Sequence, residues 1–562
     1  MTDQRRFAVA IASALVLAVT LAGCVSIPSS GPASQGLAID GSTSGTSFEV
    51  NPEGPAKGDT PSAILKGFVA AFQSSTGGYA VAREFLSSSF STKWDPTQSV
   101  QVRSGDARLV PLDSSDIEYT FTTSATIDNT GAYKQTNQPS TLSFSFVKEG
   151  KEWRISSAPN GVVLSDLTFQ RLFARHALYF LDPTGQNLVP DLRWFPNGTA
   201  PTRIVSALLA GPPAWQQGAV RTEFPDGTQL TDTGSLVTVV SGVAHVDLTA
   251  EALNATLHER QLMLVQLSDS LRSVATISSV SISVKGAPLV IDDLGSNGPQ
   301  ADAKVDGQAL VLQKTEFGFY ANGKVATIPQ LSSKVVPLSP TAATLSSDGD
   351  SLAVLGSGGV SLVRRSAATP TLLDNRPELI APSMDENGYV WSVPTDQPNA
   401  VTVYDTSGAA HSVATSLPTD ARIVSLQVSR DGARIAILLA TPTGPRLEVG
   451  AILRDQKLVP TGIGPLVVDA ALPSGEATDL TWVDELTVAI LVSVGAQSVV
   501  DEFVIGGEQS QLGDALPGAQ AIVGGNGQQG LRVLGDDSLV YSYQGSSWQS
   551  SKVSVGFIAT QR

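Results

Sequence analysis

The sequence is poor in the residues that form cross-links and metal sites. Its 562 residues include one cysteine and four histidines. A single thiol cannot form an internal disulfide, so the fold must rest on hydrophobic packing. Apolar residues make up 42% of the chain and charged residues 16%, which favours packed domains over disorder. The length is sufficient for three or four domains.

Positive charge and long apolar runs are also scarce. Lys and Arg number 36 against 52 Asp and Glu, and the net charge is −16. This sign disfavours nucleic acids and anionic lipid surfaces as partners. The one long apolar run, Phe7–Leu21, is shorter than the roughly 20 residues of a membrane-spanning helix. We therefore expect no nucleic-acid partner and no helical membrane span.

The one cysteine lies where a lipoprotein signal would place it. Arg5 and Arg6 precede the apolar run, and Leu21–Cys24 ends it. This is the order of a secretory signal peptide. The last four residues resemble a lipobox, in which a diacylglycerol is attached to the cysteine sulfur before cleavage.

We predict a signal peptide over residues 1–23, cleavage between Gly23 and Cys24, and S-diacylglycerol and N-acyl groups on Cys24. Several acyl chains on one residue give stable anchoring, where one chain would be marginal. The mature chain is then a lipid-anchored protein on the extracytoplasmic side of the cell membrane. The alternative is an uncleaved anchor helix.

Residues 24–59 are rich in Ser, Gly, Pro and Thr and predict a flexible tether of roughly 30 Å. A first α+β domain is expected over residues 60–160. Thr60-Pro61 is typical of a helix start, and two helical stretches are followed by alternating strands. This order resembles the nuclear-transport-factor-2-like (NTF2-like) cone. Its strands carry Ser and Thr but no histidine, so we interpret it as a packing or docking module; a small-ligand pocket is the alternative.

Residues 165–295 predict an α/β domain. A helix opens at Pro201, a hairpin turns at Ser241-Gly242, and a long helix follows it. The strands are expected at residues 176–181, 188–195, 236–240, 243–248 and 280–284. The long helix is expected to align five leucines on one stripe: Leu253, Leu257, Leu264, Leu267 and Leu271.

Motifs in this domain resemble the sporulation-and-germination (GerM-type) domain. They are Leu209–Pro213, the Phe-Pro-x-Gly-Thr turn at 224–228, Val246–Leu248 and Gln266-Leu267. A GerM-type domain that follows a lipobox and precedes a long β region resembles the actinobacterial LpqB lipoprotein family. The resemblance rests on the order of the segments more than on any single motif.

Residues 305–562 show no long helical stripe. Five turns centred on Asp or Asn, at 348, 385, 431, 484 and 526, each precede an apolar run, at spacings of 37 to 53 residues. This is the period of a β-propeller blade, and each blade needs neighbours to cover both of its faces. We expect five or six blades. The Ser-x-Asp-Gly pattern resembles TolB-like propellers, and we interpret its acids as turn formers.

Two histidine patterns could carry chemistry. His245 and Asp247 project from the same strand face, so a catalytic dyad is possible, but we interpret them as the polar face of a sheet. His258-Glu259 resembles the start of a zincin helix. The second metal ligand would stand at 261, which is Gln261, so the zinc interpretation fails.

The remaining candidates are isolated. His176 opens a strand without an evident partner, and His411 is expected on a loop. Asp536-Asp537 lies in a turn, whereas glycosidases need two facing carboxylates. No Gly-x-Ser-x-Gly nucleophile elbow occurs. We predict no catalytic residue, no metal and no cofactor.

The predicted function is a non-catalytic envelope scaffold that binds protein partners. The LpqB resemblance implies an accessory to an envelope sensor histidine kinase, that of the MtrAB two-component system, which is linked to division and wall homeostasis. The alternative is an envelope glycan-binding protein or hydrolase that uses the propeller channel. A transporter's solute-binding lipoprotein would need two α/β lobes, which the β-rich second half does not provide.

Overall fold

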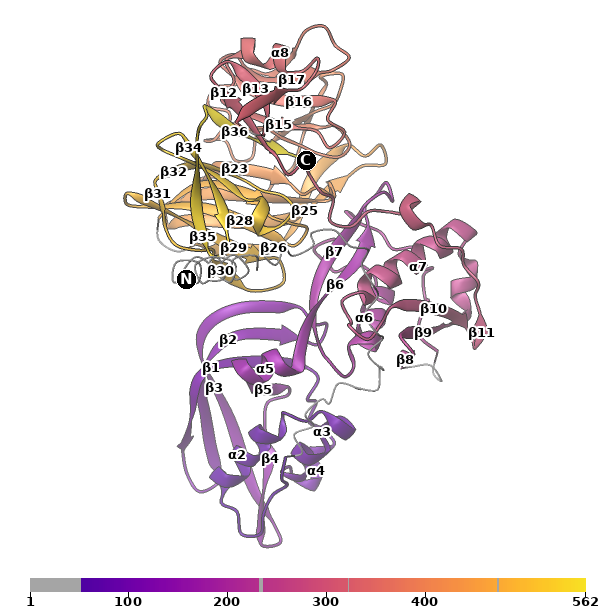
Figure 1. Ribbon diagram of the computed structural model, residues 1–562. Coiled ribbons are helices and arrows are strands. Elements are labelled where there is room, and N and C mark those ends of the chain that lie inside the picture. Colours follow the sequence, from indigo (N-terminus) through magenta and orange to yellow (C-terminus); the bar gives the residue numbers. More distant parts are fainter. Residues whose placement is uncertain (1–51, 232–235, 322, 473–474) are drawn as a thin grey trace, which may run out of the picture. The chain divides into compact units, whose positions relative to one another are not determined.

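The computed structural model describes residues 52–231, 236–321, 323–472 and 475–562. Residues Pro52–Arg562 form one compact unit. Within it, an α+β domain and an α/β domain precede a β-propeller, as the sequence predicts (Figure 1).

The first domain packs short helices against a five-stranded sheet of order β4-β3-β2-β1-β5. Thr60 caps the first helix by accepting a hydrogen bond from the Ala63 amide at 3.3 Å, and Pro61 is the first helical residue, as predicted. The helices are α2 (Pro61–Ala71), α3 (Thr76–Glu84), α4 (Ser88–Ser91) and the following α5 (Asp166–Leu172). The strands are β1 (Ser99–Pro111), β2 (Asp116–Asp128), β3 (Tyr133–Glu149), β4 (Glu152–Ser157) and β5 (Val162–Ser165).

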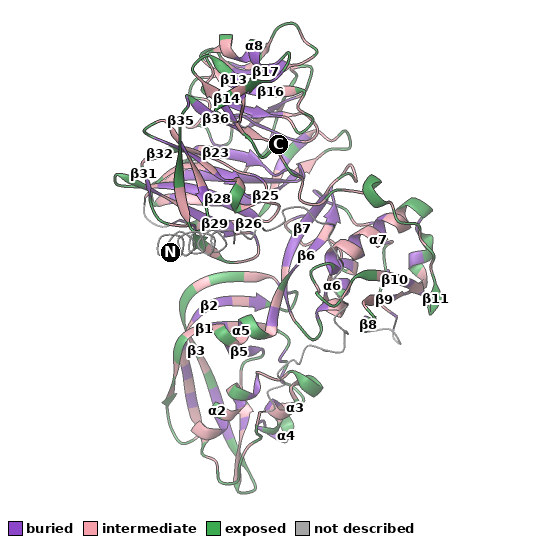
Figure 2. Cartoon of the chain, viewed as in Figure 1, coloured by how far each residue is buried: buried purple, intermediate pink, exposed green. Residues whose placement is uncertain are grey.

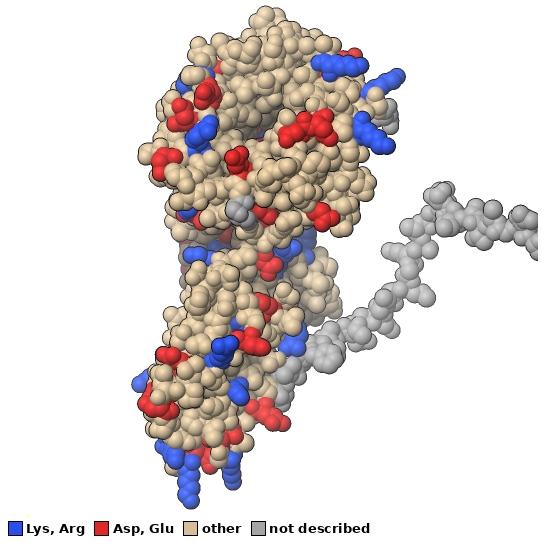
Figure 3. Space-filling model, turned by 90° about the vertical axis from the view of Figure 1, so that its left-hand side faces the viewer, with Lys and Arg blue, Asp and Glu red and all other residues tan. Residues whose placement is uncertain are grey.

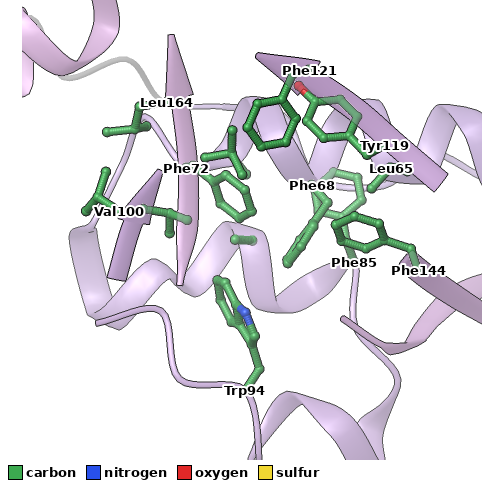
Figure 4. Close-up of a cluster of buried hydrophobic side chains, with 14 of the residues drawn as sticks. Leu65, Phe68, Phe72, Phe85, Trp94, Val100, Tyr119, Phe121, Phe144 and Leu164 are labelled. Atoms are coloured by element: carbon green, nitrogen blue, oxygen red, sulfur yellow. The ribbon is translucent and has the colours of Figure 1, made fainter. Parts of the chain in front are cut away.

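Aromatic rings fill the core of this domain. Phe68 of α2 packs 5.1 Å from Trp94 and 6.3 Å from Phe144, centroid to centroid. Figure 4 shows these rings converging with Tyr119 and Phe121 from β2. Every second residue of β2 from Ile117 to Ile127 is buried, because successive side chains of a strand point to opposite faces. The predicted alternation is confirmed.

The second domain has two sheets. A hairpin of β6 (Phe173–Leu181) and β7 (Leu188–Pro196) stands apart from a sheet of order β11-β10-β9-β8. The sheet strands are β8 (Thr238–Val240), β9 (Val243–Leu248), β10 (Ser279–Val284) and β11 (Ala287–Pro288). The helices are α6 (Ala200–Leu209) and α7 (Leu257–Leu271). The hairpin at Ser241-Gly242 is confirmed, with β8 beginning two residues later than predicted.

The predicted leucine stripe of the long helix is partly wrong. Leu253 lies in a 3₁₀ turn before α7 and is 49% exposed, and Leu257 is 63% exposed. The buried face instead contains Gln266 beside Leu267, because tertiary partners satisfy its amide. The Gln266 Oε1 accepts from the Glu223 amide at 2.9 Å, and its Nε2 donates to the Tyr179 carbonyl at 2.9 Å.

The third domain is a propeller whose described residues form six blades, within the predicted range. Blade 1 contains β36 (Phe557–Gln561), β12 (Ala309–Gln313), β13 (Glu316–Ala321) and β14 (Lys324–Thr327). Blade 2 contains β15 (Ala342–Leu345), β16 (Ser351–Gly356), β17 (Gly359–Arg364) and β18 (Thr371–Asp374). Blade 3 contains β19 (Ser383–Met384), β20 (Val390–Ser392), β21 (Thr402–Tyr404) and β22 (Ala410–Ser412).

Blade 4 contains β23 (Arg422–Val428), β24 (Arg434–Thr441), β25 (Gly444–Arg454) and β26 (Pro460–Ala471). Blade 5 contains β27 (Glu476–Trp482), β28 (Thr487–Val494), β29 (Gln497–Val504) and β30 (Gln509–Gln511), with β31 (Leu516–Pro517) beside β29. Blade 6 contains β32 (Ala519–Val523), β33 (Arg532–Gly535), β34 (Leu539–Gln544) and β35 (Ser547–Ser554). Long buried stretches in β23, β25 and β28 mark where neighbouring blades cover one another (Figure 2).

The ring closes through the last strand of the chain. The first strands of blades 2 to 6 contact one another in turn, and β36 joins both ends by pairing with β12 and β15. Each of the five predicted turns connects the first and second strands of its blade. Blade 1 has no such turn because its first strand comes from the far end of the chain.

Candidate functional site

The predicted lipidation site, Cys24, and the cleavage site after Gly23 lie outside the described residues. Both remain predictions from sequence. In the described part of the chain, no helix is long and apolar enough to cross a membrane.

The His245 and Asp247 pair lies on β9, opposite the fully buried Ala244, Val246 and Leu248. Asp247 accepts hydrogen bonds from the hydroxyls of Thr231 (2.7 Å) and Ser283 (2.5 Å) and from the Gly286 amide (2.8 Å).

Burial raises the pKa of Asp247, the three donors lower it, and the net pKa is below that of a free aspartate. The carboxylate therefore joins β9 to its neighbours and is not aimed at His245. This geometry supports the polar-sheet interpretation over a dyad.

The other three histidines, His176, His258 and His411, lie beside residues that hold the fold together. Glu259, next to His258, completes a capping box with Thr256 at the start of α7. His176 does have a partner, contrary to expectation: its Nδ1 lies 2.7 Å from the Ser273 hydroxyl oxygen. Burial lowers the pKa of His176. His411 lies in β22, and not on a loop, with its Nε2 3.6 Å from the Asp405 carboxylate.

Two acidic residues in the turns between the first and second strands of their blades are paired with arginines. Asp431, in the turn after β23, accepts from the Ser429 hydroxyl at 2.6 Å and pairs with the fully buried Arg434. Asp385, in the corresponding turn of blade 3, pairs with Arg454 at 2.7 Å. These contacts confirm the turn interpretation of the two acids.

Arg562 follows the innermost strand of blade 1 and donates to the carbonyls of Val428 and Ser429 in blade 4. Blades 1 and 4 are opposite in a ring of six, so this side chain crosses the axis. Arg430 donates to the Gly524 carbonyl of blade 6 at 2.8 Å. Two guanidinium groups thus join blades across the ring.

No group of three or more metal-ligating side chains occurs in the part of the chain that the structure describes. Asp537 accepts from the Leu539 amide at 3.0 Å and from the Tyr541 hydroxyl at 2.8 Å, which holds it in its turn.

On the face drawn in Figure 3, basic side chains are interspersed with acidic ones and separated by uncharged surface.

The residues that join the domains were missed by the sequence analysis. Trp194 of β7 stacks on Tyr133 of the first domain, with centroids 5.3 Å apart, and its Nε1 donates to the Gly506 carbonyl of the propeller at 3.0 Å. The Tyr179 hydroxyl of β6 donates to Glu485 at 2.5 Å. We call these contacts of Tyr179 and Trp194 the hairpin joint. Buried Tyr and Trp side chains commonly place a polar tip against a partner, which is the signal that could have indicated them.

Comparison with known proteins follows the same three-part division. Residues 54–170 match the family model described as "Lipoprotein LpqB, N-terminal domain", and residues 318–556 match "Lipoprotein LpqB beta-propeller domain". Residues 177–290 match "Sporulation and spore germination". The chain is 26% identical to "Lipoprotein LpqB" of Cutibacterium acnes over 90% of both chains.

The chain belongs to the lipoprotein LpqB family.

Other LpqB relatives match over shorter stretches. The LpqB of Mycolicibacterium smegmatis is 28% identical over 75% of this chain and 77% of its own. That of Rhodococcus jostii is 32% identical over 41% of this chain and 40% of its own. The first GerMN domain of the sporulation protein GerM from Bacillus subtilis shares 19% identity over 23% of this chain and 97% of that domain, with a TM-score of 0.18.

Proposed function

We propose that this LpqB-family chain is a non-catalytic accessory lipoprotein of the cell envelope, anchored at the outer face of the cytoplasmic membrane through acyl groups on Cys24. The observation that carries the proposal is the hairpin joint. One two-stranded element, β6–β7, holds both neighbouring domains through buried aromatic and polar contacts. A joined ectodomain of this kind presents a fixed set of surfaces, as a scaffold requires.

The groups that could perform chemistry support the same proposal. Asp247 binds three donors of its own sheet, His176 is buried against Ser273, and Asp431 is bound to Arg434. The names of the relatives, all lipoproteins, support the anchor.

The proposed partner is an envelope sensor histidine kinase of the MtrAB two-component type. Membership of the LpqB family is what suggests this partner. Anchoring within reach of a membrane kinase would raise the effective concentration of the ectodomain beside the kinase's extracellular part. The chain would then modulate signalling to division and wall homeostasis.

Crosslinking in intact cells of the source organism tests the proposal. The anchored chain is captured with a membrane-impermeant crosslinker, and co-purifying proteins are identified by mass spectrometry. We expect the sensor kinase to be recovered with the wild type and to be depleted with the Cys24→Ser variant.

Recovery of wall polymer without any membrane protein would contradict the scaffold proposal and favour the glycan-binding alternative. Turnover of a wall glycan or an ester by the purified chain, abolished by Asp431→Asn, would favour a hydrolase. Arg422→Ala, which alters an exposed arginine at the start of β23, is the control for non-specific changes in capture.

A further inference from the structure

A large hollow lies beside the hairpin joint. Its volume is about 770 Å³, within the roughly 300–1,000 Å³ range of small-molecule sites. The second domain supplies most of its lining, from the β6–β7 hairpin, from α6 and from the loop Gly211–Trp215. Pro465–Val467 of β26 and residues 128–132 complete it. These elements are labelled in Figure 1.

The lining of the hollow is mainly apolar. Leu178, Phe180 and Phe195 are buried beneath it, as parts of the core of the second domain. Pro212 and Pro213, which belong to a motif that resembles GerM-type domains, line it together with Trp215.

Leu466, 39% exposed, lines the hollow from β26, the outermost strand of blade 4. A solvent-accessible apolar hollow of this size is typical of a binding site for an apolar ligand.

The charged residues that line the hollow are Arg193, Arg203, Asp128 and Asp191. Asp128 accepts a hydrogen bond from the Thr130 hydroxyl in its own turn at 2.7 Å. Arg193 is already bound to Asp191 at 2.5 Å and to the Thr130 hydroxyl at 2.5 Å. Arg203 of α6 has no hydrogen-bond or ion-pair partner among the described residues.

The carboxylate of Asp95, on whose pKa Arg203 has a small lowering effect, is hydrogen-bonded chiefly to the Thr97 hydroxyl. Arg203 is therefore available to an anionic ligand group, with which a guanidinium forms strong charge-assisted hydrogen bonds.

We propose that this hollow binds an amphiphile that has a single acyl chain and an anionic head group. The acyl chain lies on Pro213, Trp215 and Leu466, which are partly exposed, and the head group pairs with Arg203. A second cavity, about 570 Å³ between α2 and β1, is lined by polar and apolar residues in similar number, and its three charged residues are Lys66, Arg103 and Asp106.

The test uses the mature chain, residues 24–562, carrying Cys24→Ser so that no acyl group of its own competes. Calorimetric titration measures Kd for saturated carboxylates of eight, ten and twelve carbons and for the matching alcohols, all below their micelle concentrations. Burial of each methylene is worth about 0.8 kcal/mol, so Kd should fall about fourfold per added carbon. Arg203→Ala should weaken carboxylate binding about tenfold and leave alcohol binding unchanged.

A matched pair of variants tests the location. Leu466→Asp puts a charge in the hollow and should weaken binding of all ligands at least tenfold. Leu372→Asp changes a leucine that is 54% exposed on β18, the outermost strand of blade 2, and should have no effect. A Kd that does not depend on chain length, or equal effects of the two variants, would overturn the proposal. Equal affinity for carboxylates and alcohols would overturn the role of Arg203.

Discussion

Trp194 should be the residue whose loss most weakens the connection between the domains. Its indole is 8% exposed and belongs to the core of the first domain while its chain position is in the second. It stacks on Tyr133 and lies 5.1 Å from Phe169, centroid to centroid. The Nε1 donates to the Gly506 carbonyl, so one side chain contacts all three domains.

Two substitutions of Trp194 separate the contribution of its ring to the free energy of unfolding from the contribution of its hydrogen bond. Trp194→Ala removes a buried indole and should cost about 3–5 kcal/mol. Trp194→Phe keeps a ring to stack but removes the donor to Gly506 and should cost about 1–2 kcal/mol. The assay is guanidinium denaturation of the full ectodomain followed by circular dichroism. A chain of three domains can unfold in more than one step. The first transition, at the lowest denaturant concentration, is therefore compared between wild type and variants.

The matched control is Trp153→Ala. Trp153 is a half-buried tryptophan of β4, beneath the Lys148 ammonium, and contacts neither of the other domains through a hydrogen bond. Trp153→Ala should lower the free energy of unfolding by less than half as much as Trp194→Ala does. Equal costs for the two alanine variants, or no change in the first transition with Trp194→Ala, would refute the idea that the hairpin joint holds the domains together.

Three further predictions concern the propeller and α7. Burial raises the pKa of Asp479 to about 6, above its unfolded value, so its contribution to stability is full below about pH 4 and is lost as the pH rises through 6. Asp479→Asn should therefore gain up to about 3 kcal/mol relative to wild type between pH 4 and pH 8, measured by urea denaturation; a pH-independent difference would contradict this. Arg562→Ala should cost about 1–3 kcal/mol by leaving two carbonyls without donors, with Arg422→Ala as a neutral control in thermal melts. Thr256→Ala should cost about 1 kcal/mol by removing the cap of α7, and a stability equal to wild type would show that the cap is dispensable.

Features set by neighbouring residues could be predicted from the sequence. Thr60 caps its helix, β2 alternates, and Ser241-Gly242 makes a hairpin because each depends on a few adjacent side chains. The five turns of the propeller are local in the same sense. They identify blades 2 to 6 and leave blade 1 unmarked, so the range of five or six blades rests on the length of the region.

Features set by distant residues could not be predicted. β36 closes the ring only because it pairs with strands from the start of the domain. Gln266 is buried because Tyr179 and Glu223 satisfy its amide, so a count of leucines misplaces the buried face of α7. His176 gains Ser273 from a segment that no sequence spacing relates to it.

The central claim, an acylated ectodomain held at the membrane, is tested most directly by mass spectrometry of the N-terminal peptide from membrane-purified protein. The account predicts a peptide that begins at residue 24 with diacylglyceryl and acyl masses on Cys24, and release of Cys24→Ser into the medium. A membrane-bound chain that retains residues 1–23 and an unmodified Cys24 would contradict it.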